Sequence, residues 1–191
     1  MDKSNHSNVL IVGGGCAGVA VASRINNLKS DLTISIIEPS EKSLYQAAWT
    51  LVGAGAYNVN DTIKPMSSVM PSYVKWIKEY AEEFSPDSNS VKTNGGSYTY
   101  DYLVVCPGLK LNFDGVAGLK EHLGKNNVCT NYSAEMATYT WDCLKQLDGG
   151  TLLFTEPPMP IKCAGAPQKI AYLAADHLKK KGKLNESNLE F

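Results

Sequence analysis

Residues 8–18 read Asn-Val-Leu-Ile-Val-Gly-Gly-Gly-Cys-Ala-Gly and carry the strongest fold signal in the chain. The apolar, β-branched run at 8–12 predicts a strand, and the glycines that follow fit the pattern G-x-G-x-x-G. Residues 19–25 are small and apolar and predict a helix, and residues 32–37 predict a second strand that ends at Glu38. Together these elements predict one βαβ unit of a Rossmann-like α/β fold.

Each glycine of the predicted turn has its own physical task. Gly13 allows the tight turn, Gly15 lets the backbone approach a pyrophosphate, and Gly18 lets the helix and strand pack closely. The helix N-terminus offers amide donors and the positive end of its dipole to an anion. Glu38 can accept hydrogen bonds from an adenosine ribose, and its charge disfavours a 2′-phosphate. The alternative, a glycine-rich turn that binds nothing, is disfavoured because strand, helix and acid are in register.

The charge and cysteine content argue against several classes of function. Eighteen basic and nineteen acidic side chains nearly cancel over 191 residues, so no basic region indicates nucleic acid. The polar N-terminus lacks the apolar core of a signal peptide, and no apolar run reaches the roughly 18 residues needed to span a bilayer. The five cysteines form no C-x-x-C pair, so we expect free thiols, and the three histidines show no metal-ligand spacing.

The middle of the chain predicts an antiparallel insertion in the first unit. Residues 72–93 read as strands with a break at 85–89, and Asn94-Gly95-Gly96 reads as a turn. Residues 97–105 form a strand that ends in a buried, parallel-type run and is closed by Cys106-Pro107-Gly108. Such an insertion before the last strand is frequent in flavin-binding domains.

One segment within the first unit leaves two interpretations open. Residues 44–55 combine small side chains with Tyr45 and Trp49. This composition fits a backbone that lies close to a flat ring, and it fits an ordinary packed helix start equally well.

A second strand-helix start follows in the C-terminal part. Residues 133–147 predict an amphipathic helix on which Cys143 packs, and residues 151–155 predict a strand. Pro167 suits the first turn of a helix that runs to about Lys181. Residues 188–191 read as the opening of another strand. Because a βαβ unit cut at its second strand cannot close a core, we expect the N-terminal part of a longer protein.

The expected domain organisation has three parts. Residues 1–115 form the dinucleotide-binding unit with its antiparallel insertion, and residues 116–150 form a connector with the amphipathic helix. Residues 151–191 begin a second, incomplete Rossmann-like unit, and this unit carries a cysteine in its turn.

The second turn, Glu-Pro-Pro-Met-Pro-Ile-Lys-Cys-Ala-Gly-Ala at 156–166, differs from the first. Its three prolines remove amide donors that a pyrophosphate needs, so we do not expect a nicotinamide dinucleotide there. Cys163 instead precedes a helix N-terminus, with Lys162 and Lys169 nearby in sequence. Both influences favour the thiolate, which is the competent nucleophile and disulfide partner. The alternative is an inert, buried cysteine.

The motifs together resemble sulfide:quinone oxidoreductase, a family of two-dinucleotide-binding-domain flavoproteins, over residues 9–191. The shared runs are Val12-Gly-Gly-Gly, Ile36-Ile-Glu-Pro-Ser-Glu, Tyr45-Gln-x-x-Trp-Thr-Leu-Val-Gly-Ala-Gly, Val74-Lys-Trp-Ile and Ile161-Lys-Cys-Ala-Gly-Ala-Pro-Gln-Lys. The last run is the most specific, and it looks like the branch that includes the mitochondrial enzymes.

The resemblance implies FAD as the cofactor and a set of residues that would hold it. This set is Gly13, Gly15, Cys16, Ala17, Gly18, Glu38, Gln46, Ala81 and Gly108. The glycine turn would cradle the FAD pyrophosphate, and Glu38 would hold the ribose. Gln46 would lie near the flavin, and Ala81 would contact the adenine end through its backbone.

The resemblance also implies a reaction. Cys163 would match the first of two redox-active cysteines, the second of which would lie in a C-terminal half beyond this chain. Sulfide would leave a persulfide on one cysteine, and the other thiolate would pass two electrons to FAD. A membrane quinone would then receive these electrons, and a thiol, sulfite or sulfide would accept the persulfide sulfur. The implied location is peripheral, on the bacterial cytoplasmic membrane or the mitochondrial inner membrane, through the C-terminal region.

Some positions depart from the family pattern. Ala47 stands where relatives often carry proline, and Cys106-Pro107-Gly108 replaces the more usual Ala-x-Gly. Cys129 lies in a region where some bacterial members have a third cysteine near the flavin, so a redox role for Cys129 stays open.

Three alternatives to this function exist. A flavocytochrome c-type sulfide dehydrogenase is disfavoured because the chain has no export signal, and a type II NADH dehydrogenase is disfavoured by the proline-rich second turn. An inert FAD-binding fragment belongs to a different class, and the visible spectrum of the purified chain would detect bound flavin.

Overall fold

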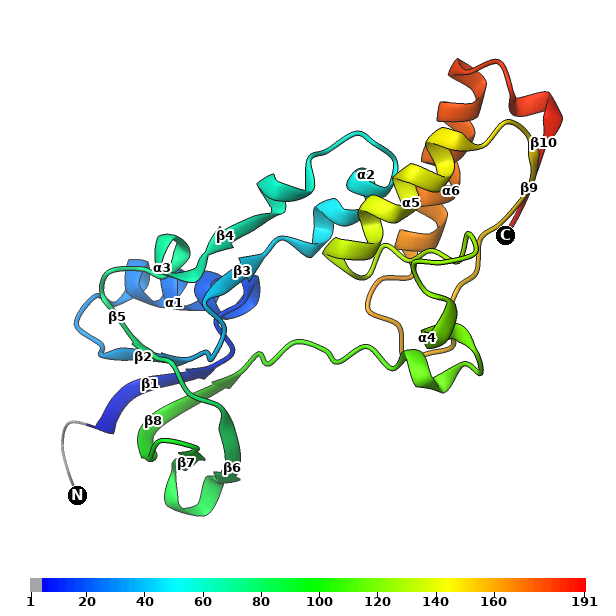
Figure 1. The fold of residues 1–191 in the computed structure, drawn as a ribbon. Coiled ribbons are helices and arrows are strands. Elements are labelled where there is room, and N and C mark those ends of the chain that lie inside the picture. Colours follow the sequence, from blue (N-terminus) through cyan, green and yellow to red (C-terminus); the bar gives the residue numbers. More distant parts are fainter. Residues whose placement is uncertain (1–4) are drawn as a thin grey trace. The chain divides into compact units, whose positions relative to one another are not determined.

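The computed structural model describes residues 5–191, which form two compact units (Figure 1). Unit 1 contains the residues up to Leu44 and residues Ile63–Gly108, and unit 2 contains Tyr45–Thr62 and Leu109–Phe191. The packing therefore groups residues 45–62 with the C-terminal segment. The linear boundaries expected at residues 115 and 150 stay a prediction.

Unit 1 is built on a six-stranded sheet. Its elements are β1 (His6–Val12), α1 (Cys16–Leu28), β2 (Ile34–Ile37), β5 (Val74–Ile77), β6 (Ala81–Ser85), β7 (Ser90–Thr93) and β8 (Ser97–Val105). The strand order is β5-β2-β1-β8-β7-β6. The first four strands of this order are parallel, whereas β7 is antiparallel to both of its neighbours. The predicted βαβ unit is thus confirmed. The antiparallel insertion is confirmed for β6 and β7, whereas β5, which was expected within it, pairs in parallel with β2.

The central strand β1 is buried on both faces of the sheet. Val9 and Ile11 belong to one apolar cluster, and Leu10 and Val12 belong to another, as the period of two in a strand requires. Ala22 of α1 packs into the first cluster, and the tyrosines of β8 pack into the second. Burial on both faces explains why residues 8–12 read as a continuous apolar run.

A short antiparallel ladder marks where the chain leaves and re-enters unit 1. Strand β3 (Lys42–Leu44) pairs with β4 (Ile63–Pro65), and α3 (Met66–Val69) follows. The Met66 amide donates to the Glu41 carbonyl at 2.7 Å. The intervening segment 45–62 belongs to unit 2.

Unit 2 packs three helices around a small core. Its helical elements are η2 (Gln46–Ala48), α2 (Trp49–Gly53), η3 (Val59–Thr62), η5 (Phe113–Gly115), α4 (Leu119–His122), α5 (Ala134–Gln146), α6 (Gly165–Lys180) and η6 (Leu184–Glu186). Trp49 and Val52 of α2 pack against Ala137 of α5. The Trp141 ring of α5 meets His177 of α6 edge-on, with ring centroids 5.0 Å apart. Residues 44–55 therefore contain a packed helix start, one of the two interpretations left open.

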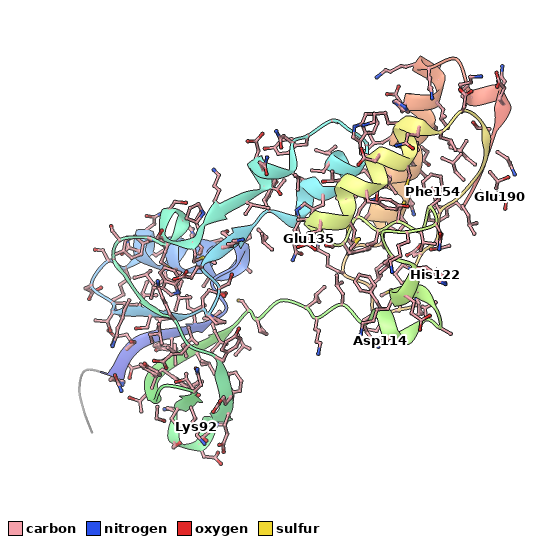
Figure 2. The ribbon with its side chains drawn as sticks, viewed as in Figure 1. Lys92, Asp114, His122, Glu135, Phe154 and Glu190 are labelled. Carbon is pink, nitrogen blue, oxygen red and sulfur yellow. The ribbon has the colours of Figure 1, made fainter. Side chains whose placement is uncertain are left out.

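The C-terminal part of unit 2 is a second βαβ arrangement. Strand β9 (Gly150–Leu153) pairs in parallel with β10 (Ser187–Glu190), and α6 connects them. Phe154 and Glu190 lie at the end of this pair (Figure 2), where the Phe154 amide donates to the Glu190 carbonyl at 2.8 Å. The predicted second unit is confirmed in these elements.

In the part of the chain that the structure describes, no helix combines the length and apolar character needed to cross a bilayer.

Candidate cofactor and thiol sites

In the turn between β1 and α1, a Cβ would overlap neighbouring atoms on Gly13, Gly14 and Gly18. Gly13 has φ +102°, and a Cβ on this residue would overlap the carbonyl oxygen of Cys106. A Cβ on Gly18 would overlap the carbonyl oxygen of Gly13. The tight turn predicted at Gly13 and the close packing predicted at Gly18 are therefore both observed.

Residues 15–17 of the turn face open space. Gly13, Gly14 and Gly18 are buried, whereas residues 15–17 are exposed. Among the described residues, no heavy atom lies within 4 Å of the place a Cβ on Gly15 would take, and no side chain caps α1. The first turn of α1 thus presents backbone amides and a positive dipole end to an open region. This is the arrangement that binds a phosphate or pyrophosphate.

Glu38 follows β2 and is joined to the glycine turn. Its Oε2 accepts from the Gly14 amide at 2.8 Å, and its Oε1 accepts from the Ser40 amide at 2.7 Å. Each carboxylate oxygen has two acceptor positions, so capacity for ribose hydroxyls is left on both. The carboxylate is therefore held in place by two amides and still able to bind a ligand.

The sequence reasoning did not assign a role to Trp76 of β5. The indole Nε1 of Trp76 donates to the Glu38 carbonyl at 2.8 Å, and Lys78 Nζ lies 4.4 Å from the Trp76 ring centroid. The indole thus fixes the backbone that carries the Glu38 carboxylate. This hydrogen bond joins β5 to the residue after β2. It could be predicted only if the parallel pairing of these two strands were already known.

The turns after β1 and β8 lie side by side. The Gly13 amide donates to the Ile37 carbonyl at 2.9 Å, and the Cys106 amide donates to the Val12 carbonyl at 2.7 Å. These bonds bring the glycine turn, Glu38 and the segment leading to Gly108 to the carboxyl ends of parallel strands, where ligands bind in open α/β sheets. Gly108 itself is exposed, with φ +77°.

The other predicted cofactor residues are distributed over both units. Ala81 opens β6 in unit 1 and packs against the cluster that contains Val12 and Ile37. Gln46 is exposed and begins η2 in unit 2. The roles expected for Ala81 and Gln46 toward a cofactor stay predictions.

Cys163 lies in unit 2, two residues before the start of α6. It is half-buried, and its thiol is free. Its carbonyl oxygen accepts from the Ala166 amide at 3.1 Å and from the Tyr132 hydroxyl at 3.2 Å. The backbone of Cys163 is therefore held both by α6 and by a side chain from a distant segment.

Tyr132 is a neighbour of Cys163 that sequence reasoning missed. Burial raises the pKa of the Tyr132 phenol, and electrostatic interaction with Cys163 and Glu156 raises it further, whereas the hydrogen bond to the Cys163 backbone lowers it. The phenol therefore stays protonated and remains a donor to the Cys163 carbonyl. Because 31 residues separate the two positions, no local pattern in the sequence indicates the contact.

Comparisons with known proteins identify a family and several similar proteins. The sequence model of the pyridine nucleotide-disulphide oxidoreductase family matches residues 7–138. The chain is 39% identical to the mitochondrial sulfide:quinone oxidoreductase of Mus musculus and 43% identical to that of Dictyostelium discoideum, with 98% of this chain covered in each. The solved sulfide:quinone oxidoreductase of Aquifex aeolicus matches 96% of this chain with a TM-score of 0.75 and 30% identity. The chain spans 42% of the length of each of these three relatives.

Proposed function

The chain belongs to the pyridine nucleotide-disulphide oxidoreductase family, and on this premise we propose that the protein oxidises sulfide and passes the electrons to a quinone. Its similarity to sulfide:quinone oxidoreductases extends along nearly the whole chain, including the segment around Cys163. The observation that carries the proposal is a half-buried thiol at the head of α6 in the second βαβ arrangement. In a dinucleotide-binding unit this place belongs to the glycine-rich phosphate turn.

The cofactor of this family is FAD, and the residues of unit 1 fit it. The exposed amides of residues 15–17 and the open space in front of Gly15 would take the pyrophosphate, and the carboxylate of Glu38 would take the ribose hydroxyls. When bound, FAD supplies a two-electron acceptor that a quinone can reoxidise. The chain's own contribution at this site is to bind and orient the cofactor.

Cys163 is the residue of this chain that we propose to react with sulfur. Hydrosulfide would attack a disulfide between Cys163 and a second cysteine outside the chain, forming one S–S bond and breaking another. One cysteine would then carry a persulfide, and the other would be released as a thiolate that holds the electron pair. An acceptor such as a thiol, sulfite or sulfide would remove the outer sulfur of the persulfide.

The proposed quinone is a membrane lipid, so the enzyme would work peripherally at a bacterial cytoplasmic or mitochondrial inner membrane. The names of the mitochondrial relatives support this location. The surface that meets the membrane is proposed to lie in a C-terminal region beyond residue 191.

The test of the proposed function is a comparison of electron donors. The protein from the complete reading frame is mixed with a soluble quinone analogue and either sulfide or NADH. We expect quinone reduction with sulfide and little with NADH, because Pro157, Pro158 and Pro160 lack the amide donors that a second dinucleotide needs. Reduction by NADH without a response to sulfide would instead establish the type II NADH dehydrogenase alternative.

Replacing Glu38 with alanine is expected to weaken FAD binding. The substitution removes the acceptor of the Gly14 and Ser40 amides and the proposed ribose partner. At about 1 kcal/mol for each hydrogen bond, the Kd for FAD should rise about tenfold or more. Flavin fluorescence titration of the deflavinated complete protein measures this change.

Glu41→Ala is the matched control for that experiment. Glu41 is exposed and pairs with Lys78 at 2.9 Å. We expect its Kd for FAD to stay within about twofold of wild type, because exposed ion pairs contribute little. Equal losses in both variants would remove Glu38 from the cofactor site.

Replacing Tyr132 with phenylalanine is expected to loosen the Cys163 backbone. One hydrogen bond of about 1 kcal/mol is lost, so the alkylation rate of Cys163 and the kcat with sulfide should each change several-fold. Tyr139→Phe is the control, because its hydroxyl accepts from the Asn127 amide at 3.2 Å and does not hold Cys163. If both variants alkylate at the wild-type rate, Tyr132 does not position the thiol.

A further inference from the structure

Two cysteines of unit 2 other than Cys163 meet at one residue. Cys129 lies in the segment before α5, and Cys143 lies in the third turn of that helix. The thiol of Cys129 donates to the Asn127 carbonyl with a sulfur–oxygen distance of 3.6 Å. The thiol of Cys143 donates to the Asn127 side-chain oxygen at 3.7 Å. Asn127 thus binds both thiols, although 14 positions separate the two cysteines in the sequence.

Cys143 also influences the ionisation of the Cys129 thiol. Burial raises the pKa of the Cys129 thiol to about 12, and repulsion from Cys143 and a hydrogen bond with it contribute in the same direction. The Thr140 hydroxyl opposes this rise. This influence and the shared contact with Asn127 place the two thiols in one neighbourhood, as a disulfide between them requires.

A third polar group completes the surroundings of the pair. The Tyr139 phenol is hydrogen-bonded to Cys143, which raises the pKa of that phenol. Tyr139 also accepts from the Asn127 amide at 3.2 Å. Tyr139 is thus a second neighbour of Cys143, beside Cys129. The raised pKa of the Cys129 thiol disfavours Cys129 as the first attacking sulfur and leaves it as the thiol that closes the bond.

We propose that Cys129 and Cys143 are a site of reversible covalent modification, at which a low-molecular-weight disulfide converts the two thiols into an intrachain disulfide. Both cysteines are half-buried rather than sealed in the core, so a small reagent can reach them. The assignment rests on unit 2 alone. It does not depend on sulfide oxidation, on FAD or on Cys163.

The proposed reaction balances in two exchange steps. The Cys143 sulfur attacks one sulfur of the small disulfide, forms a mixed disulfide and releases one small thiolate. The Cys129 sulfur then attacks the Cys143 sulfur, forms the intrachain bond and releases the second small thiolate. The protein loses two electrons, the reagent gains them, and the two cysteine protons end on the released thiols. The bond would tie the segment before α5 to the third turn of that helix.

The sequence around the pair allows a direct test by mass spectrometry. The complete protein is reduced, exposed to glutathione disulfide in mildly alkaline buffer and alkylated. Cleavage after Lys125 and Lys145 leaves both cysteines in one peptide, because the intervening residues contain no lysine or arginine. We expect this peptide to be two hydrogen masses lighter and unalkylated. A second cleavage after Glu135 should leave its two halves linked until reduction.

Variants and an unfolded reference decide the outcome. Neither Cys129→Ser nor Cys143→Ser should form the disulfide-closed peptide. Cys143→Ser should also form the mixed disulfide with glutathione at this site more slowly. Cys106→Ser, in unit 1, should form the intrachain disulfide as the wild type does. The equilibrium constant for forming the intrachain disulfide with glutathione disulfide should be at least about tenfold larger in the folded protein than in urea, because the fold holds the two sulfur atoms together. Two alkylated thiols in the folded wild type, mixed disulfides that do not close, or an equal constant in urea would each overturn the proposal.

Discussion

Replacing Cys163 with serine is expected to reduce sulfide-dependent quinone reduction by about 10²-fold or more, the loss typical of a covalent nucleophile. A hydroxyl at this position can form neither a disulfide nor a persulfide, so the proposed sulfur exchange would have no starting bond. The measurement is steady-state reduction of a soluble quinone analogue by the complete protein. The visible flavin spectrum is recorded on the same samples.

The flavin spectrum separates a chemical defect from a folding defect. Cys163 lies in unit 2 before α6, whereas the glycine turn and Glu38 belong to unit 1. We therefore expect Cys163→Ser to retain flavin while it loses turnover. Cys106→Ser serves as the matched cysteine control and should turn over sulfide at a rate close to wild type. A Cys163→Ser protein with the wild-type rate would refute the role of this thiol.

Replacing Gly13 with alanine is expected to abolish flavin retention and to lower the free energy of unfolding by roughly 3 kcal/mol. Gly13 has a positive φ, which disfavours any residue with a Cβ, and the new methyl group would overlap the Cys106 carbonyl. Relief of this overlap must separate the turns after β1 and β8. Denaturant unfolding and the flavin-to-protein absorbance ratio of the purified complete protein measure the two effects.

Gly15→Ala is the sharper comparison, because it changes the same turn without that overlap. Gly15 has φ −69°, and no described heavy atom lies within 4 Å of its added methyl group. We expect its free energy of unfolding to stay within about 0.5 kcal/mol of wild type, while FAD binding weakens because the methyl group occupies the space proposed for the pyrophosphate. If Gly13→Ala purified with a full complement of flavin, the turn would not be the cofactor cradle.

Local sequence patterns were enough to predict much of unit 1. A continuous apolar run, a glycine turn and a terminal acid led to β1, α1, β2 and the position of Glu38, and the turn at residues 94–96 led to the hairpin of β7 and β8. These features depend on local backbone conformation and on the regular alternation of buried and exposed side chains. Residues close to one another in the sequence determine both. The same holds for α5 and for the βαβ arrangement that carries Cys163, whose helix begins at Gly165, two residues before Pro167.

The contacts between segments that are distant in the sequence could be identified only from the tertiary structure. Trp49 packs on Ala137, which joins residues 45–62 to unit 2 and makes both units discontinuous in sequence. Tyr132 reaches the Cys163 carbonyl, Trp76 reaches the Glu38 carbonyl, and Cys143, expected to serve packing alone, meets Cys129 beside Asn127. Each contact depends on which helices and strands become neighbours, and no periodicity along the chain encodes that pairing. The sequence therefore predicted which groups carry the chemistry, and tertiary packing determined which partners hold them.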